Sequence, residues 1–424
     1  MTAVHETWRA LWSSRVLVWA AGVGTVTAFG FGPLRKAFDP PGVTRGFGWL
    51  GNILAAPAAR WDAAWYLVIA HYGYRPDLGV YTSSRTAFFP LYPLGLRTIS
   101  WFGVPPVVAG VLLSVAALAL ALYGIHRLTT LELSRRRASL AGDRVGDAAR
   151  LAVLLTAFTP MAFFFSAVYS EALYLALSVG VFWSARHGRW MWVGALGALA
   201  AATRSTGLVL VVPVALIYLY GPREDRPPEL QGYRRYRLRA DALWLCLLPV
   251  GVILYGSYLG LSGGNPLAPL HAQDVWGRHF AGPYLGVWDA LKAAFDGARQ
   301  LLSFQRQHVY FTAGSGSPFV SAGHNLTDLA FLLAAIPAVV GVFRRLPLAY
   351  GAYVMAALAL PLSYPVSSEP LMSLPRFLLV LFPFVIWFAA WLSERPRAQK
   401  PALVLSASLM VLFVAQFATW HWVA

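Results

Sequence analysis

Long apolar runs separated by short polar stretches recur along the whole chain. Each run is roughly 16–21 residues long, the length that a helix needs to cross the hydrocarbon core of a bilayer. A closed barrel would instead show short strands of alternating polarity. The pattern therefore predicts an all-α polytopic membrane protein with about 11 transmembrane helices. The expected spans are 16–32, 104–126, 151–168, 170–186, 190–203, 205–221, 242–262, 326–343, 347–363, 377–393 and 401–421.

Most basic residues fall in the short connections at one end of these spans, such as the arginines of 135–150 and of 223–239. Short loops rich in arginine and lysine stay on the cytoplasmic side of a membrane, so the N-terminus is expected to be cytoplasmic. Two long segments, 33–103 and 263–325, would then be outer loops. We expect the whole chain, 1–424, to form a single integral membrane domain.

The stretch from Met191 to Tyr220 has two interpretations. One long span would place Arg186 and Arg189 on the opposite side of the membrane from the later arginines. Two short half-spans that meet near Arg204 keep both basic loops on the same side. We favour the half-spans, because they also keep Arg204 away from the bilayer centre, where a guanidinium costs at least about 2.5–3.5 kcal/mol.

Composition agrees with a membrane protein, because 58% of the residues are hydrophobic and only 12% are charged. That balance leaves too little polar surface for a soluble domain. A net charge of +16 would suggest nucleic acid in a soluble protein. Here it is explained by basic loops that set topology and touch anionic membrane lipids, so no nucleic-acid partner is expected. The excess of arginine over lysine is typical of a GC-rich genome, and a bacterial plasma membrane is the expected location.

The sequence offers little support for a metal site or a cofactor, and we expect neither. Cys246 is the only cysteine, which excludes an intramolecular disulfide and a cysteine-based metal site. No DxD motif occurs. His271, Asp274 and His279 of the second outer segment could meet a cation, but loop histidines are more often solvated or packed.

A lone carboxylate, Asp62, follows the first apolar run in the sequence RWDAAWYLVIAHYGY. The run from Trp61 to Tyr72 carries aromatic residues on one face, which predicts an amphipathic helix lying in the membrane interface. Asp62 falls in its first turn, where the helix dipole and the adjacent Arg60 favour the ionised form. A carboxylate placed beside a bilayer is a candidate general base for a lipid-borne substrate. The alternative is that it only caps the helix.

Aromatic residues are frequent around this helix. They include Trp61, Trp65, Tyr66, Phe88, Phe89 and Tyr92. They could stack on a sugar ring, but we expect most of them to be interfacial anchors.

Four groups of ionisable residues converge on the outer boundary in this topology. They are Arg60 with Asp62, Glu171 in AVYSEALY, Arg204 in ATRSTGL, and 369–376 in EPLMSLPR. Charges retained at such positions are costly, and function is the usual reason for them. The structural alternative is that Glu171 and Arg204 simply pair between neighbouring helices. Arg204 and Arg376 are planar cations suited to phosphate oxygens, so we predict that they bind a donor phosphate.

Four motifs of the chain, taken together, carry a family resemblance. They are RWDAAWYLVIAHYGY with AFFPLYP, then TPMAFFFSAVYSEALYLALS, then ATRSTGL, and late in the chain SLPRFLLVLFPF. In this order they resemble the PIG-V family, the mannosyltransferases that add the second mannose of glycosylphosphatidylinositol anchors, and their bacterial relatives. The similarity extends over most of the chain. The second outer loop departs from the eukaryotic pattern, so the resemblance does not identify the acceptor.

The resemblance implies a GT-C-type glycosyltransferase fold, with two large extracytoplasmic loops that carry interfacial helices and an active site on the outer membrane face. It implies that Asp62 is the catalytic acidic residue of the first outer loop. Tyr169 and Glu171 match the family's YSE element, and Arg204 matches its RS-x-G element. With Arg60 and Trp61, the residues Tyr169 and Glu171 are expected to contact substrate. The implied partners are a polyprenyl-phosphate sugar donor and a lipid-linked or glycan acceptor, and some relatives need a small membrane partner.

Residues and resemblance together predict an inverting glycosyltransferase, and specifically a mannosyltransferase. It would move a hexose from a polyprenyl-phosphate donor to a lipid-linked or membrane-proximal glycan acceptor. One carboxylate suffices for such a transfer, whereas a hydrolase of the common type uses two. The main rival is a transporter or flippase of lipid-linked sugars, which would show repeated halves and helices broken near the midplane. A second rival is a glycan-binding partner without catalysis.

Overall fold

In the computed structural model the described residues are 2–31, 41–44, 48–74, 82–134, 142–226, 235–310 and 317–423. The long helices are α1 (Ala3–Phe29), α7 (Pro106–Ser134), α8 (Gly142–Phe158), α9 (Glu171–Arg186), α10 (Trp190–Thr203), α14 (Pro283–Ser303), α15 (Pro318–Arg345), α16 (Leu348–Leu362) and α19 (Pro396–Ala418). Those of intermediate length are α4 (Ala63–Tyr72), α6 (Leu91–Ser100), α11 (Val211–Tyr220), α12 (Val250–Leu261) and α18 (Phe382–Ser393). The short ones are α2 (Pro41–Thr44), α3 (Gly48–Leu54), α5 (Thr82–Arg85), α13 (Ala268–His271) and α17 (Leu374–Leu379). The 3-10 helices are η1 (Ala56–Ala58), η2 (Ala162–Phe165), η3 (Ser205–Leu210), η5 (Ala240–Leu247) and η6 (Ala272–Trp276).

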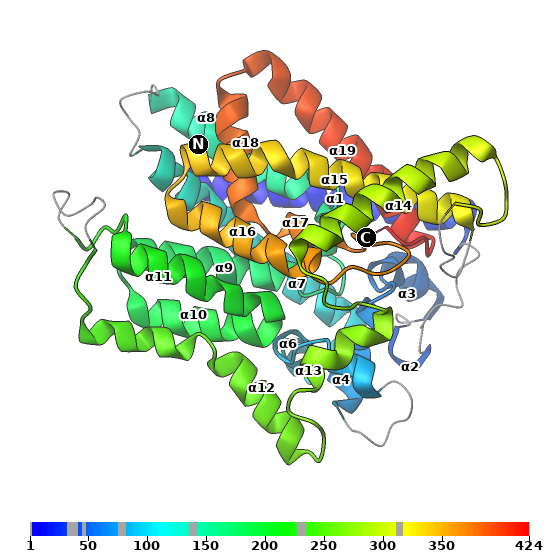
Figure 1. The fold of residues 1–424 in the computed structure, drawn as a ribbon, viewed down its shortest axis with the longest axis horizontal. Coiled ribbons are helices and arrows are strands. Elements are labelled where there is room, and N and C mark those ends of the chain that lie inside the picture. Colours follow the sequence, from blue (N-terminus) through cyan, green and yellow to red (C-terminus); the bar gives the residue numbers. More distant parts are fainter. Residues whose placement is uncertain are drawn as a thin grey trace.

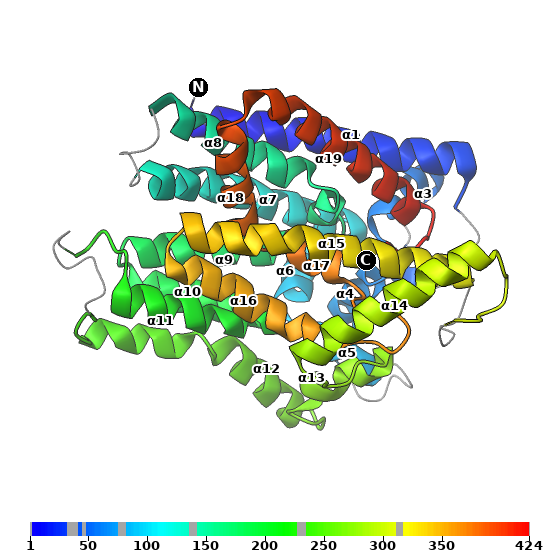
Figure 2. The ribbon, with the colours of Figure 1, turned by 45° about the horizontal axis from the view of Figure 1, so that its top comes forward.

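Most long helices run side by side along the long axis of the molecule (Figure 1). Helix α7 packs against α8 and α9, and α9 packs against α10. Helices α1 and α19 lie together along one face, as Figure 2 shows. Helices α2, α3 and α4 of the first predicted outer segment lie on the right of Figure 1, and α6 and α13 lie beside them toward the lower middle. The start of α1 lies at the opposite end, so the tertiary structure brings both predicted outer segments together.

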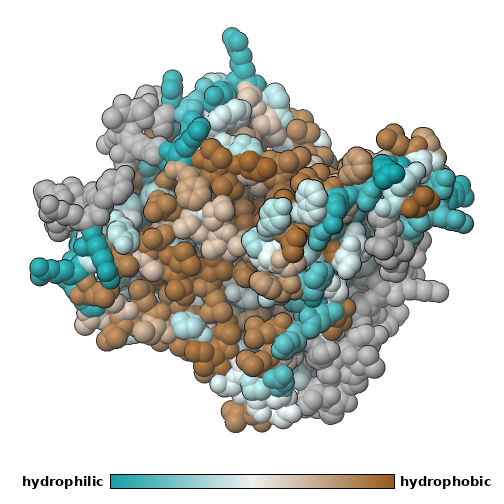
Figure 3. All heavy atoms as spheres, in the orientation of Figure 1, coloured by the Kyte–Doolittle hydropathy of each residue, from teal (hydrophilic) through white to brown (hydrophobic). Residues whose placement is uncertain are grey.

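The membrane character of the chain is confirmed by its long apolar helices. Three helices among the described residues, α7, α15 and α19, are long and apolar enough to cross a membrane. The pair η5 and α12, bent by 42°, makes a fourth if it is one broken span. Figure 3 shows hydrophobic surface over the middle of one face, with hydrophilic residues toward its edges. Exposed large apolar side chains are expected where helices face lipid. The eleven crossings and the GT-C-type fold stay predictions.

Proline explains where one predicted span ends early. The apolar pattern predicts a span over 151–168, but α8 ends at Phe158. Pro160 follows, and proline lacks a backbone N–H and disfavours the helical conformation in the residue before it. The chain continues as the 3-10 helix η2, whose four residues are all buried.

The predicted break of 191–220 near Arg204 is present, while the assignment of its two halves to the membrane stays a prediction. Helix α10 ends at Thr203, Arg204 has an extended backbone, and η3 with α11 follows. The chain reverses there. The evidence is the hydrogen bond from the Glu224 N–H to the Arg186 carbonyl oxygen, at 2.8 Å, which brings the segment after α11 back to the turn before α10. The Arg186 turn and the segment after α11 therefore lie at the same end of the molecule.

The prediction of an interfacial helix over 61–72 is wrong. Every residue of α4 from Ala63 to Ala70 is buried, with no exposed polar face. Neighbouring elements α2 and α6 pack against it. The aromatic periodicity reflects packing within the protein, because a ring can be buried in a core as well as in a lipid headgroup layer.

Candidate functional site

Four charged side chains form a continuous chain of ion pairs at the end of the bundle where the two outer segments meet. Arg376 donates through Nη1 to Asp62 Oδ2 at 2.6 Å. Its Nε lies 3.3 Å from Glu171 Oε1. The same carboxylate oxygen lies 2.8 Å from Arg204 Nη1. The structure thus joins Asp62, Glu171, Arg204 and Arg376, and the predicted convergence of these residues from four separate segments is confirmed.

The backbone around Asp62 is held by Tyr169. The Tyr169 hydroxyl accepts a hydrogen bond from the Asp62 N–H at 3.1 Å and donates to the Arg60 carbonyl oxygen at 3.0 Å. Burial, and then the negative charge of Asp62, raise the pKa of the Tyr169 phenol well above its ordinary value, so the phenol stays protonated. Tyr169 therefore positions the acid.

Asp62 does not cap helix α4. It occupies the N-cap position but its side chain makes no capping hydrogen bond. Its carboxylate turns instead to Arg376, and it is 15% exposed. The helix-capping alternative is therefore wrong. A partly exposed carboxylate with one cationic partner remains accessible to a substrate hydroxyl.

Glu171 is the first residue of α9 and is almost fully buried, at 1% exposure. The positive end of the helix dipole and two guanidinium groups stabilise its charge there. Its second oxygen, Oε2, is buried and has no hydrogen-bond partner among the described residues. The pairing of Glu171 with Arg204, which we weighed as a structural alternative, is present. A buried acceptor without a partner is costly, so a ligand donor that reached it would stabilise it.

Arg376 reaches the site from helix α17, near the C-terminal part of the chain. Ser373 precedes this helix in a left-handed conformation, with φ of 72°, which turns the loop sharply before α17. Burial alone would lower the pKa of Arg376, but the carboxylates of Asp62 and Glu171 outweigh it and raise the pKa above its ordinary value. Arg376 therefore remains a cation at the centre of the cluster.

Arg60 and Trp61 face the C-terminal segment. Arg60 Nε donates to the Ala418 carbonyl oxygen at 3.2 Å, and its guanidinium lies 4.8 Å from the Trp420 ring centre. The indole N–H of Trp61 donates to the His421 carbonyl oxygen at 3.2 Å. The cation paired with Asp62 is Arg376, although the sequence places Arg60 closer. Contact of Arg60 and Trp61 with substrate stays a prediction.

The aromatic residues around α4 pack inside the protein. Trp65, Tyr66, Phe88, Phe89 and Tyr92 are each less than 10% exposed. Our expectation that most of these rings anchor the protein in the membrane interface is therefore wrong. Tyr66 packs edge-on against Phe88 and Tyr92 and is hydrogen-bonded to Ser170, the residue before Glu171.

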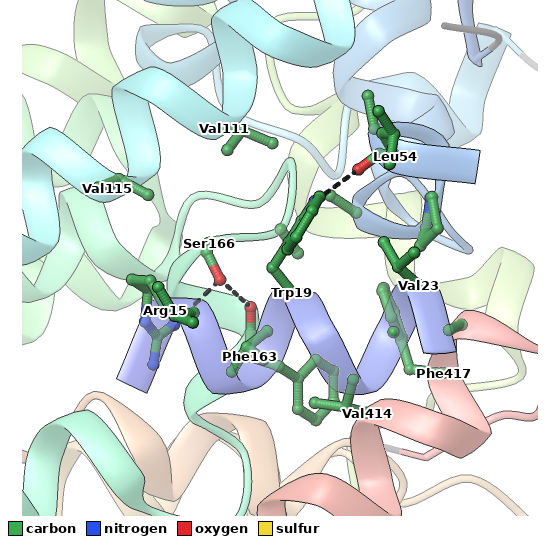
Figure 4. Close-up of a pocket in the computed structure, with 18 of the residues that line it drawn as sticks. Arg15, Trp19, Val23, Leu54, Val111, Val115, Phe163, Ser166, Val414 and Phe417 are labelled. Atoms are coloured by element: carbon green, nitrogen blue, oxygen red, sulfur yellow. Dashed lines mark hydrogen bonds between the residues drawn. The ribbon is translucent and has the colours of Figure 1, made fainter. Parts of the chain in front are cut away.

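An apolar pocket of about 430 Å³ lies behind this site, between α1, α7 and α19 (Figure 4). Trp19, Val111 and Val414 are among its lining residues. Its lining residue Phe417 also packs against Tyr169, with ring centres 6.1 Å apart. The pocket therefore shares a wall with the residue that positions Asp62.

Arg15 is the charged residue at this pocket, and it is satisfied by the protein itself. Its Nη1 donates to the Ala162 carbonyl oxygen and to Ser166, and its Nη2 donates to the Ala157 carbonyl oxygen. These carbonyls include one at the C-terminal end of α8, where a cation is favourable. The remaining lining is largely apolar, as expected for a hydrocarbon ligand.

One further arginine near the site was not singled out by sequence reasoning. Arg278 follows η6 in the second outer segment and lies 5.9 Å from the ring centre of Phe377, the neighbour of Arg376. It belongs to no recognisable motif, so only its tertiary position distinguishes it. Elsewhere in the described part of the chain, no group of three or more histidine, cysteine or acidic side chains is arranged to hold a metal ion.

Comparison with known proteins places this site in context. A family model described as Mannosyltransferase (PIG-V) matches residues 20–221. The GPI alpha-1,6-mannosyltransferase 2 of Rattus norvegicus is 33% identical over 41% of this chain and 35% of its own length. That of Mus musculus is 35% identical over 36% of this chain and 29% of its own length. That of Homo sapiens is 32% identical over 42% of this chain and 35% of its own length. No solved structure matches.

The matched region contains Asp62, Tyr169, Glu171 and Arg204, whereas Arg376 lies beyond it. The similarity is thus less extensive than the motifs suggested, and the matches span only about a third of the curated relatives' length. Within 20–221 the chain has the sequence features of the PIG-V mannosyltransferases, and the resemblance inferred from its motifs is confirmed over that region.

Proposed function

We propose that this protein is an inverting glycosyltransferase, and specifically a mannosyltransferase, that takes a hexose from a polyprenyl-phosphate donor. The acceptor would be a lipid-linked or membrane-proximal glycan on the extracytoplasmic face. The single observation that carries this proposal is the ion-pair chain from Asp62 through Arg376 and Glu171 to Arg204. It places a candidate base beside cations suited to a phosphate, in a chain whose first half matches mannosyltransferases.

In the proposed reaction the acceptor hydroxyl attacks the anomeric carbon of the donor sugar. The bond between that carbon and the phosphate oxygen breaks, and the electron pair leaves with the polyprenyl phosphate. Asp62 takes the hydroxyl proton. Arg204 and Arg376 stabilise the charge that develops on the departing phosphate. A single displacement of this kind inverts the anomeric configuration.

The pairing of Asp62 with Arg376 physically links proton removal from the acceptor to departure of the phosphate. While Asp62 is ionised, it holds Arg376 through a 2.6 Å hydrogen bond. Once Asp62 accepts a proton, it loses its charge and its attraction for the guanidinium falls. Arg376 then becomes available to the phosphate at the moment when the phosphate gains negative charge. Proton transfer and leaving-group stabilisation would thereby support each other.

The remaining polar groups suit a sugar. Glu171 Oε2 is buried without a hydrogen-bond partner in the described structure, and a sugar hydroxyl is a donor of the right kind for it. The apolar pocket between α1, α7 and α19 suits a hydrocarbon chain of a lipid-linked substrate. None of the matches reported above supports the transporter alternative, since each is to a mannosyltransferase.

The decisive experiment is transfer by purified protein reconstituted into lipid vesicles. The donor is radiolabelled polyprenyl-phosphate mannose, and the acceptor is a lipid extract of the producing cells. We expect label to move into an extractable glycolipid or glycan fraction. Failure to transfer from this donor, while a nucleotide sugar supports transfer, would refute the proposed donor class.

A matched pair of variants tests the phosphate assignment. Arg204→Ala removes a proposed phosphate cation, whereas Arg299→Ala removes an exposed arginine of α14 that pairs with Asp296 and lies over the Tyr310 ring. We expect Arg204→Ala to weaken donor binding by about 10- to 150-fold, the range for a lost charge-assisted hydrogen bond. Arg299→Ala should leave it unchanged. Equal donor affinity in both variants would place the phosphate elsewhere.

A further inference from the structure

The Phe377 ring is surrounded by three guanidinium groups. The guanidinium carbons of Arg204, Arg278 and Arg376 lie 5.7, 5.9 and 5.8 Å from its ring centre. Arginine is attracted to an aromatic face at this distance. Three cations gathered on one phenyl ring also repel one another, so such a cluster needs negative charge nearby.

In the described part of the chain, two of these three arginines form ion pairs with carboxylates and the third does not. Arg376 pairs with Asp62 and Glu171, and Arg204 pairs with Glu171. Arg278 is only 8% exposed, yet within the described residues it forms no ion pair. Its hydrogen bonds go from Nη1 to the Tyr364 carbonyl oxygen at 3.1 Å and from Nη2 to the Met372 carbonyl oxygen at 2.7 Å.

Those two hydrogen bonds fix where the Arg278 guanidinium sits. They join the second outer segment to both ends of the loop between α16 and α17. An antiparallel bridge between Arg278 and Val366 strengthens the junction. The guanidinium is therefore held in place beside Arg376 before any ligand arrives, and preorganised cations bind anions with little loss of entropy.

The two acids whose charge acts on Arg278 are Asp62 and Asp328. Asp62 is already hydrogen-bonded to Arg376. Asp328 is buried on α15, and it acts on Arg278 only at longer range than an ion pair. Burial, and then the positive charge of Arg376, lower the pKa of Arg278 to about 10. Among the described residues the charge of Arg278 thus lacks a counterion within ion-pair distance, although the group is still protonated at neutral pH.

We propose that Arg278 is a third cation for the donor's phosphate, acting with Arg204 and Arg376 from the second outer segment. The ligand is the monophosphate group of an isoprenoid lipid, and the anion supplies the close counter-charge that Arg278 lacks among the described residues. This inference rests on the proposed function. It adds a residue from outside the matched region of the chain, and it makes the second outer segment part of the donor site.

The test compares binding of a short isoprenyl monophosphate with binding of the corresponding uncharged isoprenol. Full-length protein in detergent is used, and the two ligands differ only in the phosphate. In Arg278→Gln we expect phosphate affinity to fall about 10- to 150-fold, with isoprenol affinity unchanged. Arg278→Lys keeps the charge but lacks the planar fork, so its loss of phosphate affinity should be smaller. Arg299→Gln, an exposed change on α14, is the matched control and should bind both ligands as the wild type does.

If Arg278 only holds the loop in place, the variants should behave differently. Loss of the loop contacts alone would weaken both ligands together, and Arg278→Lys would be as damaging as Arg278→Gln. That result, or wild-type phosphate affinity in Arg278→Gln, overturns the proposal. If Arg278→Gln does not fold, Arg278→Lys decides the matter, since the proposal still requires a selective loss of phosphate binding in that variant.

Measuring isoprenyl-phosphate binding and sugar transfer separately distinguishes a failure of this inference from a failure of the proposed function. Wild-type protein that binds isoprenyl phosphate through Arg278 but transfers no sugar would refute the glycosyltransferase alone. Wild-type protein that transfers sugar, with Arg278→Gln binding the phosphate normally, would refute the role of Arg278 alone.

Discussion

At the scale of single residues, the candidate site is centred on one arginine, Arg376, that two carboxylates share. Asp62 and Glu171 both contact Arg376, but they differ in exposure, at 15% and 1% for their side chains. A base must reach the acceptor hydroxyl, so the more exposed carboxylate suits that role. The buried one, with two arginine partners, suits orientation of the cations and of a sugar hydroxyl.

The first prediction concerns Asp62→Asn. The amide keeps the size of the side chain and can still accept a hydrogen bond from Arg376, but it cannot take a proton. We expect kcat to fall about 10²- to 10⁴-fold, the usual contribution of a general base, with little change in donor affinity. Single-turnover transfer in vesicles measures the rate, and a thermal unfolding curve checks the fold. Near-normal turnover by a folded variant would show that another group accepts the proton.

The sequence could predict that these acids and arginines gather at one site, but not that Arg376 is the direct partner of Asp62. Asp62 and Glu171 stand in motifs that match a known family, and each begins a predicted helix. The hydrogen bond from Arg376 to Asp62 joins residues 314 positions apart. Local periodicity carries no information about such a contact. Sequence reasoning therefore paired Asp62 with the adjacent Arg60, and the structure replaces that partner with Arg376.

At the scale of elements, the site depends on how closely η3 returns onto α10. Gly207 faces the backbone of α10, where an added Cβ would lie 2.3 Å from Ala201 N and 2.4 Å from Ala200 O. Backbone atoms cannot move aside as a side chain can. The glycine therefore permits the tight reversal that presents Arg204 to Glu171.

The second prediction follows from that reversal. Gly207→Ala should push η3 away from α10 and displace Arg204, because the new methyl group would overlap the α10 backbone. We expect a loss of about 1–3 kcal/mol in unfolding free energy, together with weaker donor binding. Gly146→Ala on α8 is a suitable control, since its added Cβ would meet nothing within 4 Å. Unchanged stability and donor binding in Gly207→Ala would contradict the proposed packing.

At the far end of the bundle a buried ion pair joins three helices. Arg186 of α9 donates to Glu132 of α7 at 2.5 Å, and Tyr350 of α16 donates to the same carboxylate oxygen at 2.8 Å. Arg186 also donates to the Pro222 carbonyl oxygen at 2.6 Å. Both charged side chains are fully buried, at 0% and 2% exposure. The network ties the turn after α11 to the helices that carry the site.

The third prediction tests this network. Glu132→Ala leaves the Arg186 guanidinium buried without its counter-charge, and loss of one partner of a buried pair costs about 3–5 kcal/mol. We expect a large drop in thermal stability in detergent, with residual transfer activity at low temperature because the site is distant. The exposed pair of Arg345 with Glu394 offers the control, since Glu394→Ala should cost about 1 kcal/mol or less. Equal losses in the two variants would show that the buried network adds no special stability.

At the scale of the whole molecule, the helices of the outer segments and the turn at Arg186 lie in different regions of the structure. The helices α2, α3 and α4 of the first predicted outer segment lie toward one end. The turn of Arg186 and the segment after α11 meet at another point, through the hydrogen bond between Glu224 and Arg186. Apolar surface covers the middle of one face between them (Figure 3).

The fourth prediction is that a membrane separates these two ends. In a variant with Cys246→Ser, single cysteines at Arg189 and at Asn265 should react with an impermeant maleimide from opposite faces of the membrane. Both positions are exposed, and basic turns stay in the cytoplasm. Labelling of oriented vesicles or intact cells measures the side. If both cysteines react from the same face, the predicted orientation of the site is wrong.

The sequence by itself determined the class of the molecule, because membrane-length apolar runs and basic turns are local properties that every position contributes to independently. It also placed the break at Arg204, since a guanidinium is too costly in the bilayer centre. Only the tertiary structure decided that α4 is buried, that Arg376 serves Asp62, and that Arg278 joins Arg204 around Phe377. Each of these depends on which distant segments pack together. Packing is selected by the shape and charge of whole surfaces, and no short stretch of sequence records it.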